Sequence, residues 1–226
     1  MENPQQPSSA RITQQASESV KAGADIRERV HDLTLEALRA RRFDSKSVRE
    51  VVKAVSEGIA LGAESSRAEV RQSLADAFQG LDDALRKSTE AGQTALRQIV
   101  ATGRGFTEND LKAALASLRK IEEDFLSTVT QVADAAGKTV QPELRAVLSE
   151  ARRAGTETGR QVASTLSEFA QRASVATLDV TLAGLQAAGE FGARFALLAA
   201  GMLGGVADAI RKSEPGPSSP SSKKPV

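Results

Sequence analysis

The residue types that most often carry catalysis or bind metals are scarce in this sequence. His31 is the only histidine among 226 residues, and the chain has no cysteine. A nucleophile–base pair or a zinc site needs further imidazole or thiol groups beside it. The sequence therefore predicts that His31 is an ordinary helix-surface residue.

Two other patterns could suggest chemistry, and both have simpler explanations. Gly103-Arg104-Gly105 lacks the preceding strand and the Gly-Lys-Ser/Thr ending of a phosphate-binding loop, so it predicts a helix break. Glu122, Glu123 and Asp124 are consecutive in a helical pattern, so their carboxylates should point in different directions. They predict a solvated face and no acid–base pair.

Composition narrows the classes of partner. With 30 basic and 29 acidic residues the formal net charge is +1, and the seven phenylalanines are scattered with no tryptophan or tyrosine. Nucleic-acid binding generally needs a basic field or a row of stacking rings. We therefore expect a non-enzymatic protein with no cofactor, no metal, no small-molecule substrate and no nucleic-acid partner.

Residues 173–210 form the least charged stretch of the chain, with only four charged residues, Asp179, Glu190, Arg194 and Asp208. Small residues recur at every fourth position from Gly184 to Gly204, which in a helix makes a ridge that another backbone can approach closely. Large apolar residues flank this ridge. The predicted interaction surface is Gly184, Ala188, Phe191, Gly192, Phe195, Leu198, Ala200, Met202, Gly204 and Val206.

This stretch could pack in an oligomer, lie on an apolar surface or cross a membrane. Its uncharged part, 195–207, has 13 residues. At about 1.5 Å per residue it covers roughly 20 Å of a hydrocarbon core that is about 30 Å thick. Its length thus favours packing or surface binding over a spanning helix.

An 11-residue repeat runs through the preceding part of the chain, with uncharged residues at steps of four, three and four. Its positions are Val48, Val52, Val55, Ile59, Ala63, Ser66, Val70, Leu74, Ala77, Leu81, Leu85, Ser88, Gly92, Leu96 and Ile99. Two of the three columns continue in frame, through positions such as Thr158, to Met202 and Val206. This period equals 3.67 residues per turn and keeps an apolar stripe nearly straight along a helix. Asp82 and Arg86 lie beside the stripe and are predicted to contribute little to packing.

The predicted fold is all-α, with long amphipathic helices in an elongated bundle or coiled coil. Four helices are expected, at about 9–42, 46–102, 108–136 and 142–211. Ser47 and Glu50 form an S-x-x-E capping box at the second, and Pro142 suits the start of the fourth. In domain terms, we expect a helical region 10–136 with breaks near 43 and 103–107, and a C-terminal helical region 137–211 that is apolar from 173. The Pro/Ser-rich ends, 1–9 and 212–226, are expected to be disordered.

The sequence resembles bacterial phasins, small helical proteins that coat polyhydroxyalkanoate storage granules. The resemblance rests on the alanine-rich helices without cysteine or tryptophan, on segments such as ALGAESSRAEV at 60–70, and on the Pro/Ser/Lys tail. It implies a granule surface as the partner, and it covers residues 45–210.

The expected function is self-association and coating of an apolar surface, either a storage granule or a membrane face. Two alternatives remain open at this point: a soluble coiled-coil scaffold without a lipid role, and a membrane-inserted assembly built from 173–210. The N-terminus has no basic segment followed by an apolar core, so we expect no secretory signal and a cytoplasmic protein that associates with a granule or membrane.

Overall fold

The structure, a computed structural model, describes residues 7–41, 44–65, 69–102 and 108–172, all of whose regular elements are α-helices. Seven helices lie in these ranges: α1 Ser9–Lys21, α2 Ile26–Arg39, α3 Ser45–Ser65, α4 Val70–Thr102, α5 Glu108–Ala135, α6 Val140–Ala154 and α7 Glu157–Arg172. The all-α prediction is therefore confirmed for the described part of the chain.

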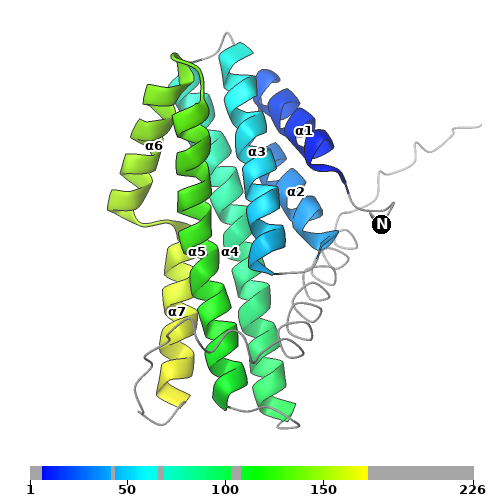
Figure 1. Ribbon diagram of the computed structural model, residues 1–226, viewed down its shortest axis with the longest axis vertical. Coiled ribbons are helices and arrows are strands. Elements are labelled where there is room, and N and C mark those ends of the chain that lie inside the picture. The colour runs from blue at the N-terminus through cyan, green and yellow to red at the C-terminus, as the bar shows by residue number, and fades with distance from the viewer. Residues whose placement is uncertain (1–6, 42–43, 66–68, 103–107, 173–226) are drawn as a thin grey trace, which may run out of the picture.

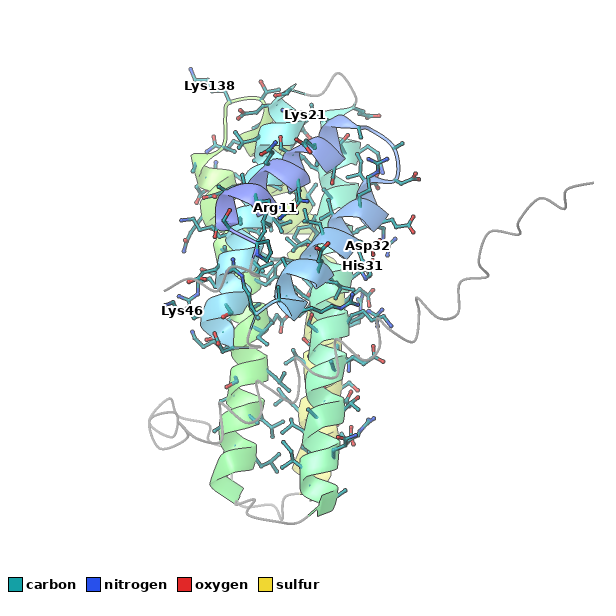
Figure 2. The ribbon with its side chains drawn as sticks, turned by 90° about the vertical axis from the view of Figure 1, so that its right-hand side faces the viewer. Arg11, Lys21, His31, Asp32, Lys46 and Lys138 are labelled. Atoms are coloured by element: carbon teal, nitrogen blue, oxygen red, sulfur yellow. The ribbon has the colours of Figure 1, made fainter. Side chains whose placement is uncertain are left out.

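The helices form an antiparallel bundle built around the long helices α3, α4 and α5 (Figure 1). On one side, α6 and α7 follow one another, with α6 against α4 and α5 and α7 mainly against α4. On the other side, α1 packs along α3 and α2 packs along α4. Figure 2 shows that α1 and α2 cover only the upper half of the bundle, while α4 and α5 extend beyond them.

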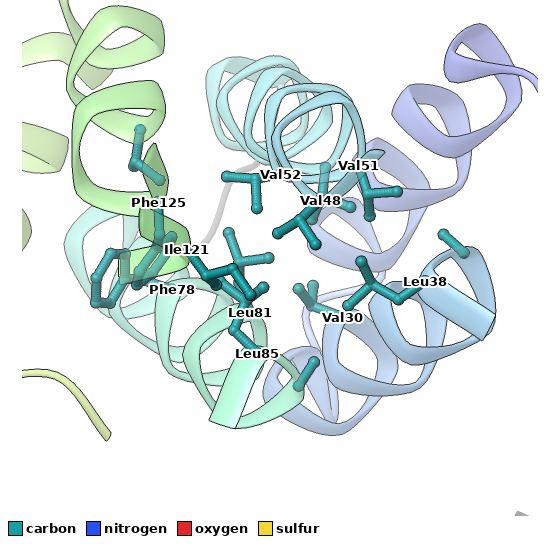
Figure 3. Close-up of a cluster of buried hydrophobic side chains, with 14 of the residues drawn as sticks. Val30, Leu38, Val48, Val51, Val52, Phe78, Leu81, Leu85, Ile121 and Phe125 are labelled. Carbon is teal, nitrogen blue, oxygen red and sulfur yellow. The ribbon is translucent and has the colours of Figure 1, made fainter. Parts of the chain in front are cut away.

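A core of aliphatic side chains with few aromatic rings fills the upper half (Figure 3). Val48 and Val52 of α3 meet Leu81 and Leu85 of α4, and all four are at most 1% exposed. Phe125 of α5 stacks on Phe78 of α4 with ring centroids 5.3 Å apart. Alanine and valine supply much of the remaining core, so the helices meet along narrow seams.

The stripe predicted from the 11-residue spacing faces the inside of this bundle in α3 and α4. All of its described positions are buried except Val70 and Ile99, which are partly buried. The spacing does not describe one continuous straight stripe, however, because α3 and α4 run in opposite directions (Figure 1). The apolar stripes of α3 and α4 are thus covered within a single molecule.

The prediction of one helix over 9–42 is wrong, because the chain breaks between α1 and α2. Gly23 and Asp25 have φ values of 71° and 53°, both in the left-handed region. Asparagine and aspartate enter this region more readily than most residues, and glycine enters it freely. The spacing of apolar residues continues across the break, which is why periodicity alone missed it.

The single helix predicted over 46–102 is also two helices, since α3 ends at Ser65 and α4 begins at Val70. No glycine or proline marks this boundary. The sequence does contain a second S-x-x-E pattern, Ser66 to Glu69, directly before Val70. That pattern is the signal that could have located the new helix start.

The predicted cap of α3 is displaced by three residues. Asp44, and not Ser47, accepts the backbone hydrogen bond, with Ser47 N donating to Asp44 Oδ1 at 2.8 Å. Glu50 instead accepts from Arg41 Nη1 at 3.0 Å. A carboxylate accepts such bonds at least as well as a hydroxyl, so Asp44 takes the capping role.

The helix bounds agree with the expected breaks near 43, 103–107 and 137, where α2, α4 and α5 end before the next helix begins. Pro142 lies in the first turn of α6. The helix expected over 142–211 is interrupted, however, because α6 ends at Ala154 and Gly155 takes a φ of 79°. Residues beyond 172 lie outside the described part.

Glycines set the distance between the outer and inner helices. A Cβ built on Gly58 would lie 2.3 Å from Thr13 O and 2.6 Å from Ala16 Cβ, and one on Gly62 would lie 2.7 Å from Ser17 O. Gly80 is equally close to α2, at 2.2 Å from Arg27 O. No residue other than glycine fits at such distances without a backbone shift.

We expect Gly58→Ala to lower the free energy of unfolding by about 1–3 kcal/mol, because the added methyl group meets a backbone carbonyl that cannot rotate away. Gly137→Ala is the matched control, since its Cβ would meet only the flexible carboxylate of Glu64. Guanidinium denaturation followed by circular dichroism measures both. Equal midpoints for the two variants would show that the α1–α3 distance is not fixed by Gly58.

Leu85 offers a test of the inward-facing stripe, because its side chain is fully buried. Leu85→Lys should lower the free energy of unfolding by about 3 kcal/mol or more, since a buried, unpaired charge loses its hydration. Arg86→Ala, one position away and half-exposed, should change it by less than about 1 kcal/mol. Similar losses for the two variants would contradict the buried stripe.

Candidate functional site

The predicted interaction surface, from Gly184 to Val206, lies outside the described residues. The structure therefore places none of its ten members. A functional arrangement within residues 7–172 has to be built from other side chains.

Of the residues considered first for chemistry, the structure describes His31, Glu122, Glu123 and Asp124, of which Glu123 is exposed and the other three are partly exposed. His31 is partly exposed on α2, and its Nδ1 lies 2.9 Å from Asp32 Oδ1 (Figure 2). On α5, Asp124 pairs with Arg49 at 3.0 Å and Glu123 pairs with Arg119 at 3.3 Å. These carboxylates do point in different directions, as the helical spacing predicts.

No group of three or more His, Asp or Glu side chains within the described ranges could hold a metal ion. Within the described ranges, no helix has both the length and the hydropathy needed to cross a bilayer.

The most concentrated polar contacts join α4 to the start of α7. Asp82 is 6% exposed, and its two carboxylate oxygens accept hydrogen bonds from Glu157 N at 2.7 Å and Thr158 N at 3.0 Å. Thr158 Oγ1 donates to Asp82 Oδ1 at 2.7 Å. A side chain of one helix thus caps another, 75 residues later in sequence.

Local sequence explains why α7 begins at this point. Gly155 adopts a backbone conformation that ends α6, and Thr156 follows it. Thr156 Oγ1 accepts from Gly159 N at 2.9 Å, which satisfies a further free amide of the first turn. Together Asp82 and Thr156 pair the backbone amides of 157, 158 and 159.

A second polar group links the same two helices further along. Gln93 Nε2 donates to Glu168 Oε2 at 2.6 Å, and Arg97 Nη2 donates to the same oxygen at 2.7 Å. Gln161 Nε2 donates to Gln93 Oε1 at 2.8 Å. The hydrogen bond to Glu168 raises the pKa of Arg97 above its ordinary value, so the guanidinium stays charged.

We call these two groups together the α4–α7 polar seam. Its members are Asp82, Gln93, Arg97, Thr158, Gln161 and Glu168. These hydrogen bonds all join one helix to the other, and each acceptor has a donor. Such an arrangement positions a helix and offers no activated base or nucleophile.

Sequence reasoning missed this seam because it placed Asp82 beside the stripe and expected it to contribute little to packing. That prediction is wrong, since the carboxylate is buried against α7. Thr158 was recognised only as an uncharged stripe position. A threonine in an otherwise apolar column, in a helical first turn, was the available sign of a polar partner.

A hollow of about 590 Å³ lies beside the seam, between α4, α6 and α7. Phe78 and Val147 contribute apolar surface to it. Its rim carries two ion pairs, Arg27 with Asp83 at 2.7 Å and Arg160 with Glu157. The hydrogen bond from Arg160 lowers the pKa of Glu157 and raises that of Arg160. Each pair is neutral in itself, but the whole lining has three arginines against five carboxylates and is therefore acidic on balance.

Asp82→Ala should lower the free energy of unfolding by about 2–4 kcal/mol, because it leaves the backbone amides of Glu157 and Thr158 without their acceptor. Asp83→Ala is the matched control, as it removes only an exposed pair with Arg27 and should lower it by about 0–1 kcal/mol. Thermal and chemical denaturation of both variants check the difference. A loss for Asp82→Ala no larger than the control's would argue against a capping role.

Comparison with known proteins gives one match. No curated protein and no solved structure is similar to this chain at a significant level. A sequence family described as a family of unknown function, DUF6781, matches residues 2–212. The match includes the apolar stretch 173–210 and ends before most of the Pro/Ser/Lys tail. Because it spans nearly the entire sequence, the chain belongs to this family of unknown function.

Proposed function

We propose that this protein is a non-enzymatic helical protein that self-associates and coats an apolar surface, either a storage granule or a membrane face. The observation that carries the proposal is the apolar stretch 173–210, which forms part of the family match and follows directly after the bundle. A contiguous apolar surface on a soluble protein usually serves binding.

The bundle itself offers little apolar surface in its closed form. Leu61, at 51%, is the exposed large hydrophobic residue among those described. The stripes of α3 and α4 are already covered by other helices of the same chain. An apolar surface would therefore first contact 173–210, and the bundle helices would contribute only after their seams separate.

The composition of the bundle core lowers the free energy needed to separate its helices. Along with its alanines and valines, the bundle buries many hydroxyl and amide side chains, among them Thr34, Ser88, Thr89, Gln93, Thr128 and Thr165. Burying alanine or threonine removes less apolar area from water than burying leucine or phenylalanine, at about 25 cal/mol per Å². An external apolar surface could replace these internal contacts at modest cost in free energy.

The resemblance to phasins supports a polyhydroxyalkanoate granule as the surface. Phasin-like proteins would meet such granules in the cytoplasm, which is the location we propose. The 11-residue spacing supports the same proposal, because a nearly straight apolar stripe on an opened helix can lie flat on a polymer or lipid.

A soluble scaffold without a lipid role is the second candidate. The contacts between helices within the bundle favour this candidate, since they already cover most of the apolar side chains of the described helices. A membrane-inserted assembly through 173–210 is the third, and detergent-dependent extraction from a cell pellet would identify it.

Substitutions on the small-residue ridge distinguish packing between copies of the chain from binding to an apolar surface. If 173–210 packs against other copies, Gly192→Leu and Gly204→Leu should reduce oligomer size, because a branched side chain blocks close approach. If it lies on an apolar surface, each substitution adds roughly 100 Å² of apolar area and should strengthen binding by up to about 2.5 kcal/mol. Light scattering and co-sedimentation with a phospholipid-stabilised triolein emulsion measure both effects on one sample.

Ala10→Leu, on the exposed side of α1, controls for a general increase in hydrophobicity. The coat proposal predicts emulsion binding by the unchanged protein and tighter binding by both glycine variants. Soluble oligomers that never sediment with the emulsion would instead support the scaffold.

A further inference from the structure

The helices of the bundle are held by two different kinds of interface. The α1–α3 and α2–α4 contacts are close backbone approaches at Gly58, Gly62 and Gly80, lined by apolar side chains. The α4–α7 contact is mainly polar, through the α4–α7 polar seam. Water can replace the hydrogen bonds of the second kind but not the apolar packing of the first.

The apolar part of the α7 interface is small. Among its described side chains, which are those of residues 157–169, Val162 and Phe169 are the buried large apolar ones and Leu166 is partly buried. Thr158 and Thr165 are buried there as well. By contrast α3 buries eight apolar side chains, namely Val48, Val51, Val52, Ala54, Val55, Ile59, Ala60 and Ala63. Detaching α7 therefore exposes less apolar area to water than detaching α3.

The junction before α7 suits a hinge. Gly155 is exposed, has a φ of 79°, and a Cβ there would meet only Arg160 Nη1, at 3.9 Å. Nothing crowds this residue, and glycine can change its dihedral angles across regions closed to other residues. The chain can turn here while α6 remains packed against α4 and α5.

On the basis of the proposed function, we infer that α7 is the first helix to leave the bundle and that it then binds the apolar surface. Its inward side, Thr158, Val162, Thr165, Leu166 and Phe169, has the three- and four-residue spacing of an amphipathic helix. Release from α4 turns this side outward. In the absence of a surface, the α4–α7 polar seam holds α7 against α4.

The charge of α7 indicates which kind of surface it meets. The helix carries two acidic residues, Glu157 and Glu168, and two basic residues, Arg160 and Arg172, so its net charge is zero. Interfacial helices that select anionic lipids are rich in lysine and arginine on the polar face. The detached helix should therefore bind an uncharged apolar surface, such as a polymer or neutral lipid.

Reversible cross-linking of the full chain tests whether α7 must leave α4 to bind the surface. The chain has no native cysteine, so only the introduced cysteines react. Gln93→Cys with Gln161→Cys, joined by a short reducible bis-maleimide, fixes α7 to α4. Arg27→Cys with Asp83→Cys, joined by the same reagent, fixes α2 to α4 as the matched control. Each protein is compared before and after reduction, which separates the link from the substitutions.

Binding to a triolein emulsion should fall at least tenfold with the α4–α7 link and recover on reduction, while the α2–α4 link should leave it unchanged. Emulsions stabilised by zwitterionic or by anionic phospholipid should bind the unlinked protein equally. An equal loss from both links would mean that the entire bundle opens, and no loss from the α4–α7 link would mean that binding does not use α7. Either result overturns the inference but leaves the coat proposal standing.

Hydrogen exchange in solution tests the same inference without a surface. Amides of α7 should exchange at least tenfold faster than those of α3, and the α4–α7 link should slow them. If the unlinked protein fails to bind any emulsion, the proposed function fails, yet this exchange difference still decides whether α7 opens first. Exchange in α7 as slow as in α3 would overturn the inference.

Discussion

Close approach between helix backbones is the constraint on which this bundle depends. Aromatic residues make up only 3% of the chain, and alanine and valine supply much of the core, so its helices pack well only when their backbones lie near one another. Gly58, Gly62 and Gly80 allow this approach by leaving room for a carbonyl or a methyl group of the facing helix. Thr13 Oγ1 reinforces it by donating to Ala54 O at 3.0 Å.

The other side of the bundle relies on polar contacts as well. Where α7 meets α4, threonine, glutamine and charged residues take positions that leucine would occupy in a denser core. A buried carboxylate such as Asp82 is tolerated only with donors around it, and the start of α7 supplies them. The two sides of one helix, α4, thus hold their partners by different kinds of contact.

This difference connects the fold to the proposed activity. A protein that coats a surface needs a stable closed form and a segment that can leave it without unfolding the rest. The glycine-mediated contacts of α1 and α2 suit the first need, and the polar seam beside Gly155 suits the second.

The sequence by itself determined the helical class, the uncharged stripe and several helix ends, because these depend on local periodicity and on glycine and proline. The S-x-x-E pattern from Ser66 to Glu69 is also local, and it indicates the start of α4. Only the tertiary structure decided that α3 and α4 reverse direction while keeping one spacing, since a repeat does not record which helix faces which. Only the tertiary structure shows that Asp82 is buried. Its partners, the amides of Glu157 and Thr158, lie 75 and 76 residues later in the sequence and reach it only through helix packing.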